Sequence, residues 1–164
     1  MEASGSVVIR HPNREKAESK ATKAAVVLLL LASAGLVAII TGGGWSDLQG
    51  AQFVAIISVL IYLLMAYYVA RWNRGVLPVA SAIAILIAVL AAIAAPAWFN
   101  RDKAGLHNPA LPPSLLGLLC IVLVVVSLLL IAFAMRGFSQ NWHVEVEEHR
   151  GEGERDLYGA APAL

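Results

Sequence analysis

Four long stretches of this chain contain no Asp, Glu, Lys, Arg or His, and short polar segments separate them. The stretches run over residues 24–41, 52–70, 76–99 and 114–135. As helices rising 1.5 Å per residue, they reach about the 30 Å thickness of a bilayer's hydrocarbon core. Helices are required there because an unpaired backbone group in lipid is very costly. The pattern predicts an all-α membrane protein with four transmembrane helices.

The connections between these stretches are short, which predicts that consecutive helices run antiparallel in an up-down bundle. They comprise a Gly-rich turn over 42–50, a tight turn over 71–75 and a Pro-rich loop over 100–113. Three parts are therefore predicted: an N-terminal tail (1–23), a transmembrane domain (24–135) and a C-terminal tail (136–164), disordered from about residue 150. We interpret the first stretch as an uncleaved helix, because it is long for a signal peptide and no A-x-A-like site follows it.

Composition agrees with this interpretation. Of the 164 residues, 59% are hydrophobic and only 14% are charged, and the mean hydropathy is +0.74, values too apolar for an ordinary soluble domain. No basic stripe interleaved with aromatic residues is present, so we expect no nucleic-acid partner.

Lysine and arginine predict the orientation. Five lie in the N-terminal tail, two in the second connection and three in the C-terminal tail, against none in the first connection and two in the third. The positive-inside rule then places both termini in the cytoplasm, and we expect a multi-pass protein of the bacterial inner (plasma) membrane. The expected interfacial anchors are Trp45, Trp72, Trp98, Arg71, Arg74 and Arg136.

Alanines at a spacing of four predict a helix-packing seam. Ala80, Ala84, Ala88 and Ala92 would form one ridge, and Ala34 and Ala38 would offer a partner surface. Small side chains let two helices approach closely in lipid, although frequent alanine without a specific seam would give the same pattern. Because 114–135 is mostly Leu and Val, we expect that helix to face lipid more than the others.

Each tail contains a short run that is typical of a strand: Asn141–His149 has a period-two pattern, and Ser6–His11 is a β-like run that Pro12 stops. Since both tails are expected on one side of the membrane, they could pair as a small β-ribbon; two disordered tails are the alternative. The histidines at 143 and 149 would stand about 20 Å apart on an extended strand. We therefore expect no metal site there.

Little in the sequence points to chemistry. No ionisable acid or base lies at membrane depth, which argues against a proton-coupled pump, and Cys120 sits among apolar residues that keep a thiol unreactive. We therefore expect no catalytic residue, cofactor or enzyme activity. The favoured hypothesis is a noncatalytic accessory or scaffold subunit of a larger membrane complex, in contact with lipid and with another membrane protein or further copies of itself. The alternative is an oligomeric transporter or channel-like protein for a neutral or apolar solute.

The chain length and the turn Gly42-Gly43-Gly44-Trp45 resemble those of small four-helix accessory subunits of bacterial respiratory oxidases. The resemblance covers one turn and implies no functional residue.

Overall fold

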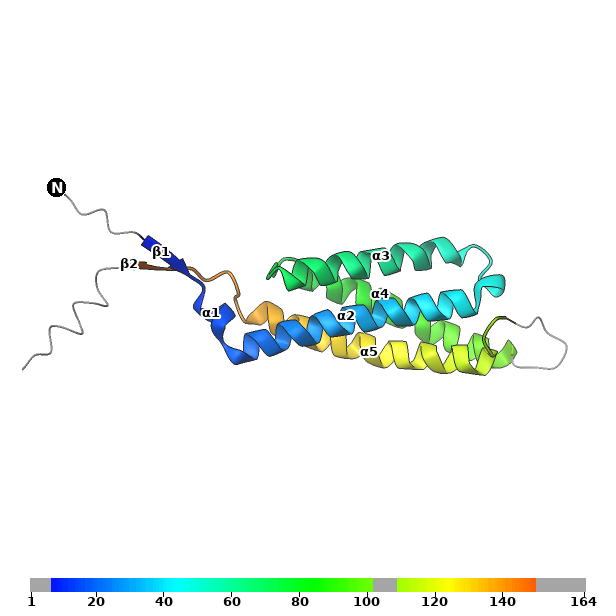
Figure 1. The fold of residues 1–164 in the computed structure, drawn as a ribbon. Helices are drawn as coiled ribbons and strands as arrows, with labels where there is room; N and C mark the ends of the chain where they lie inside the picture. Colours follow the sequence, from blue (N-terminus) through cyan, green and yellow to red (C-terminus); the bar gives the residue numbers. More distant parts are fainter. Residues whose placement is uncertain (1–6, 102–108, 150–164) are drawn as a thin grey trace, which may run out of the picture.

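The computed structural model describes residues 7–101 and 109–149. Four long helices account for most of this part of the chain, with a short strand at either end (Figure 1). In chain order the elements are β1 (Val7–Arg10), α1 (Pro12–Glu15), α2 (Ala17–Gly43), the 3-10 turn η1 (Trp45–Asp47), α3 (Ala51–Ala70), α4 (Val76–Arg101), α5 (Pro113–Ser139) and β2 (Val146–His149).

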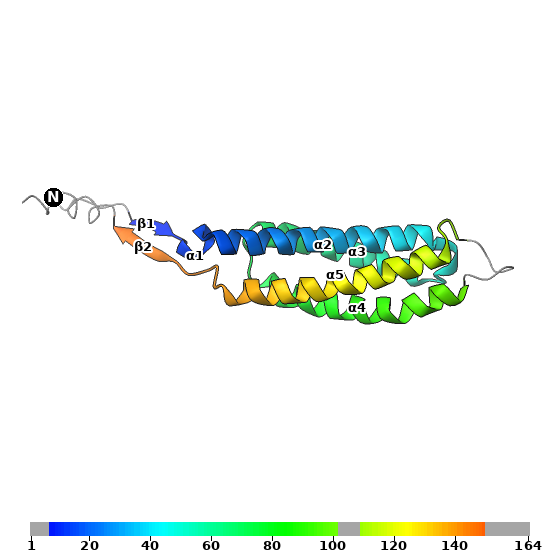
Figure 2. The same cartoon turned by 90° about the horizontal axis from the view of Figure 1, so that it is seen from below.

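The four long helices pack as a bundle along one common direction (Figures 1 and 2). α4 packs most extensively on α5, α2 packs on both α3 and α5, and α3 touches α4 only sparsely. We call the end with the two strands and the α3–α4 turn the tail end, and the end with η1 the loop end. All four helices are long and apolar enough to cross a bilayer, which indicates a multi-pass membrane protein.

The helices match the predicted stretches but extend beyond some of them. α2 begins at Ala17, seven residues before the predicted start, and α5 ends at Ser139, four residues after the predicted end. The difference arises because charge-free runs mark only the part of a helix that lies in the hydrocarbon core. The helix itself continues into polar residues that have a high helix propensity. α2 begins after Lys16, whose ψ of 135° is extended.

Buried positions repeat every three or four residues in each helix. On α5 they include Leu116, Cys120, Leu123, Ser127, Leu130, Ala134 and Gly137. On α4 they include Leu77, Ala80, Ala84, Ile87, Ala91, Ala95 and Trp98. This spacing averages 3.5 residues, the period of helices that pack at small crossing angles in a left-handed bundle. One continuous seam therefore runs along each helix.

The expectation that 114–135 faces lipid most is wrong. α3 is the least buried of the four spans, and α5 is buried as fully as α4. The reason is a row of small residues on the buried face of α5: Gly117, Cys120, Ser127, Ala134 and Gly137. These let α4 and α5 approach closely, while other apolar residues of α5, such as Leu118, Val125 and Leu128, are exposed.

The two tails pair as an antiparallel ribbon, which confirms the β-ribbon hypothesis. Val7 stands opposite His149 and Arg10 opposite Val146, so each strand is only four residues long. Both views show the ribbon extending away from the tail end of the bundle (Figures 1 and 2). The disorder predicted from about residue 150, and half of the Pro-rich loop (102–108), lie outside the described residues.

Candidate functional site

The predicted alanine seam divides between buried and exposed positions. Ala80, Ala84 and Ala88 on α4 and Ala34 on α2 are buried, whereas Ala92 and Ala38 are exposed. A spacing of four runs ahead of the 3.6-residue turn, so the buried face of α4 moves from Ala88 to Ala91 and Ala95. α4 lies chiefly on α5, not on α2 as the sequence analysis expected.

At the tail end, Trp142 is the largest fully buried side chain. Its ring meets the ring of Trp72 edge to face, with centroids 5.3 Å apart, and an added Cβ on Gly137 would lie 3.1 Å from it. The indole N–H donates to Gln140 Oε1 at 3.1 Å, and Gln140 Nε2 donates to Thr22 Oγ1 at 3.0 Å. Trp142 thus joins the segment after α5 to α2 and to the α3–α4 turn.

Two basic side chains from the N-terminal part of the chain also contact Trp72 and Trp142; we call this cluster the tail-end cap. Lys23 Nζ lies 4.1 Å from the centroid of the Trp72 ring and donates to the carbonyl of Ala70 at 3.3 Å. Arg14 Nε donates to the carbonyl of Trp142 at 2.9 Å. Trp72 has a φ of 65°, a left-handed conformation that costs about 1–2 kcal/mol. The contacts of its ring offset that strain.

The three arginines predicted as anchors differ in their surroundings. Arg71 is exposed beside the Tyr67 ring, with its guanidinium 5.9 Å from the centroid. Arg74 is partly buried, and its guanidinium carbon lies 4.2 Å from the centroid of the Phe138 ring. Its Nε makes no hydrogen bond within the described part of the chain. Arg136 is exposed in the last turns of α5. All three lie at the tail end, as a basic rim requires.

At the loop end, Trp98 and Trp45 have opposite environments. Trp98 is only 5% exposed. Its ring packs so closely on Gly44 that a Cβ added there would lie 2.6 Å from the nearest ring atom. It is therefore a packing residue of the bundle. Trp45 is 53% exposed, and its carbonyl accepts a hydrogen bond of 2.9 Å from Gln52 Nε2.

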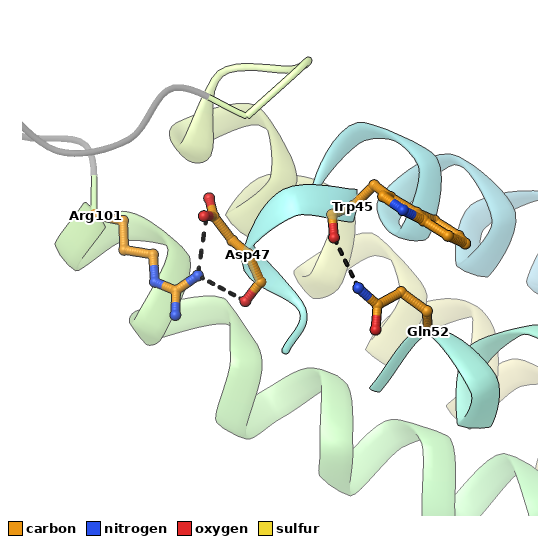
Figure 3. A network of polar contacts seen from close by, with 4 residues as sticks. All are labelled: Trp45, Asp47, Gln52 and Arg101. Carbon is orange, nitrogen blue, oxygen red and sulfur yellow. Dashed lines mark hydrogen bonds and ion pairs between the residues drawn. The ribbon is translucent and has the colours of Figure 1, made fainter. Parts of the chain in front are cut away.

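Arg101 and Asp47 form the main polar contact of the loop end (Figure 3). Arg101 Nη1 donates to the Asp47 carbonyl at 3.4 Å and lies 4.0 Å from the Asp47 carboxylate. The guanidinium also lies 5.2 Å from the centroid of the Trp98 ring. This cluster ties the end of α4 to η1.

Two of the hollows among the membrane-spanning helices are lined by residues of α3. An apolar cavity of about 270 Å³ is lined by residues of all four helices, including Val37, Ala55, Ala91 and Leu123. A groove of about 240 Å³ lies between α2 and α3 and is lined by Ala38, Thr41, Gly42, Trp45, Ala55, Ile56, Val59 and Leu60. Sequence reasoning found neither, because a hollow depends on how the helices pair.

Most of the buried hydroxyls in the spans bond within their own helix. The hydroxyls of Ser33, Thr41, Ser58 and Ser81 each donate to a carbonyl one turn earlier on their own helix. Those of Tyr62 and Ser127 are buried with no hydrogen-bond partner among the described residues. Within those residues, no group of three or more His, Cys, Asp or Glu could hold a metal ion.

Comparison of the chain with protein-family models, with curated proteins and with solved structures finds no match.

Proposed function

We propose that this protein is a noncatalytic accessory or scaffold subunit that packs one face of its bundle against a transmembrane helix of another membrane protein. The proposal rests on one observation, the exposed stripe of small residues on α2 beside the α2–α3 groove. Gly35, Ala38 and Gly42 are exposed on α2. Added Cβ atoms on Gly35 and Gly42 would meet nothing within 4 Å.

The spacing of this stripe supports a helix as the partner. Gly35, Ala38 and Gly42 lie three and then four residues apart, so they stay on one face of α2 as the buried seam does on the other. The groove of about 240 Å³ begins at Ala38 and Gly42. Helices associate in lipid through close backbone approach, which small residues permit and which bulky Leu or Ile would prevent.

The charge distribution supports an orientation for this subunit. The N-terminal tail, the Arg71–Arg74 turn and the C-terminal tail carry most of the Lys and Arg, and Arg71, Arg74 and Arg136 lie at the tail end of the bundle. By the positive-inside rule this end faces the cytoplasm of a bacterial inner membrane. The β-ribbon would then stand on the cytoplasmic side, available to the same partner.

Site-specific photo-crosslinking in native membranes tests the α2 face. A crosslinking residue at Ala38 should capture a stoichiometric membrane partner, identified by mass spectrometry after mild detergent extraction. The matched control is Leu128, 58% exposed on α5, which should not capture it. Gly35→Leu should lower recovery of the partner at least tenfold, whereas Ala82→Leu on the exposed face of α4 should not. Equal capture from Ala38 and Leu128, or an intact monomer with no partner, would contradict the proposal.

A second candidate function is an oligomeric transporter or channel-like protein for a neutral or apolar solute. The apolar cavity of about 270 Å³ favours an apolar solute over a polar one. Recovery of a homo-oligomer alone, followed by solute flux in liposomes, would support this function. A monomer inactive in flux assays would exclude it.

A further inference from the structure

The cavity of about 270 Å³ opens sideways between α3 and α4. Its lining includes Val54 on α3 and Leu90 on α4, which are 57% and 45% exposed, and these two helices touch each other only sparsely. The cavity begins near Leu48 and Ala51 at the loop end and reaches Ser58, about 10 Å further along α3 at 1.5 Å per residue. It is therefore accessible from the lipid, in the half of the bundle nearer the loop end.

The cavity suits a hydrocarbon chain better than water or a helix. Its hydroxyls, Thr41 and Ser58, donate to their own helices at 2.6 and 2.7 Å, so neither donates into the cavity and water has little to hold it there. An empty cavity would lose dispersion contacts on every wall. A helix, 10–12 Å wide with its side chains, is too thick to enter. A lipid chain is both slim and apolar.

Another hollow, of about 170 Å³, lies next to this cavity at the polar cluster of the loop end. It is lined by Asp47, Leu48, Ala94, Ala97, Trp98 and Arg101, and it shares Leu48 and Ala94 with the apolar cavity. From Ile87 in the cavity to Arg101, α4 rises about 21 Å. The two hollows together have an apolar interior and a charged mouth, the profile of an amphiphile.

Arg101 has unused capacity for an anionic group. Its contacts with Asp47 both use Nη1, and Nε and Nη2 make no hydrogen bond within the described residues. The Arg101 side chain is 42% exposed, whereas that of Asp47 is 15% exposed. A guanidinium binds phosphate through two parallel N–H donors. Figure 3 shows that the other two guanidinium nitrogens point away from Asp47, and with the side chain 42% exposed they can offer these donors.

We propose that these hollows bind one membrane phospholipid, with an acyl chain in the cavity between α3 and α4 and the phosphate on Arg101. The cavity opens between α3 and α4, whereas the α2 stripe borders the groove between α2 and α3, and the two hollows share only Thr41 and Ala55 in their lining. Lipid binding therefore does not depend on a protein partner. Bound lipid would fill the gap that the sparse α3–α4 contact leaves. It would thereby hold α3, the least buried span, in the bundle.

Native mass spectrometry of the full-length protein in mild detergent tests this site with three added probes. These are phosphatidylglycerol, phosphatidylcholine and diacylglycerol with identical acyl chains. Both phospholipids should give a one-to-one adduct, and diacylglycerol, which lacks the phosphate, should bind about tenfold more weakly, the equivalent of 1.4 kcal/mol. Arg101→Gln should weaken phospholipid binding to the diacylglycerol level, and Arg136→Gln should leave it unchanged.

A substitution that fills the cavity with a larger side chain tests the acyl-chain part of the site. Ala94 lines both hollows, so Ala94→Phe should lower the adducts of all three probes at least tenfold, while Ala82→Phe, on the exposed face of the same helix, should not. Circular dichroism and thermal unfolding check that each variant is folded; if Ala94→Phe fails to fold, Ala91→Leu serves instead. Equal adducts from the Ala94 and Ala82 variants would overturn the chain site. Equal binding of phospholipid and diacylglycerol would overturn the role of Arg101.

Discussion

Replacing Trp142 by alanine should undock the two tails from the bundle while leaving the four spans folded. Trp142 is fully buried and packs edge to face on Trp72. An aromatic side chain buries about 150–250 Å², and at about 25 cal/mol per Å² its removal costs about 4–6 kcal/mol as an upper bound. We take about 3 kcal/mol as the realised loss, because core Trp→Ala changes cost about 3–5 kcal/mol and the site lies at one end of the bundle.

The lost stability should affect the tails because few other contacts hold them to the bundle. A two-stranded ribbon is marginal alone. Besides Trp142, Asn13 donates to the Asn141 carbonyl at 3.1 Å and Arg14 to the Trp142 carbonyl, and His11 lies 3.5 Å from Glu145. The spans hold their own backbone hydrogen bonds in lipid. A loss of about 3 kcal/mol opens the ribbon at least a hundredfold more often.

Amide hydrogen exchange in nanodiscs measures this opening. Amides of residues 7–10 and 146–149 should exchange at least a hundredfold faster in Trp142→Ala, up to the random-coil limit, with little change in the spans. The control is Trp45→Ala at the loop end, where the side chain is 53% exposed. Two results would refute the reasoning: ribbon amides that already exchange at random-coil rates in the parent protein, or ribbon rates unchanged by the Trp142 substitution.

Three further substitutions test individual contacts by thermal unfolding of the solubilised protein. Gly44→Ala should destabilise by about 1–3 kcal/mol, since its Cβ would overlap the Trp98 ring; Gly42→Ala, which meets nothing within 4 Å, is the control and should be neutral. Tyr62→Phe should raise stability by up to about 1–3 kcal/mol, because it removes a buried hydroxyl without a partner; a lower unfolding temperature would show that this hydroxyl is bonded. Asp47→Asn should cost under about 1 kcal/mol, because the ion pair with Arg101 is long and partly exposed, and a larger loss would mark that pair as structural.

The sequence predicted the spans well because the bilayer imposes a simple rule on them. Charged side chains are excluded from the hydrocarbon core, so charge-free runs locate helices without knowledge of their packing. The tails were equally predictable, because Val7-Val8-Ile9 is a β-branched run, Val144 and Val146 alternate with glutamates, and the topology brings both tails to one end. The pairing β1–β2 follows from those two facts.

Helix partners were not predictable in the same way. The spacing of four from Ala80 to Ala92 suggested a straight ridge, but the buried face follows a 3.5-residue period and leaves Ala92 exposed. A search for small residues at heptad spacing, such as Cys120, Ser127 and Ala134, would have identified α5 as a packing helix. The two hollows and the cap around Trp142 depend on contacts between residues distant in sequence, which local patterns do not encode.

The neighbour relations of the helices constrain the order in which the bundle can be assembled during synthesis. α5 is inserted last, yet it is the main packing partner of α4 and also contacts α2. Until the ribosome has released residues as far as Ser139, α4 has only its sparse contact with α3, and the hairpin of α2 and α3 has one side open. A chain truncated after α4 would present these open faces to membrane proteases. We therefore expect the earlier three helices to depend on completion of the last one for their packing.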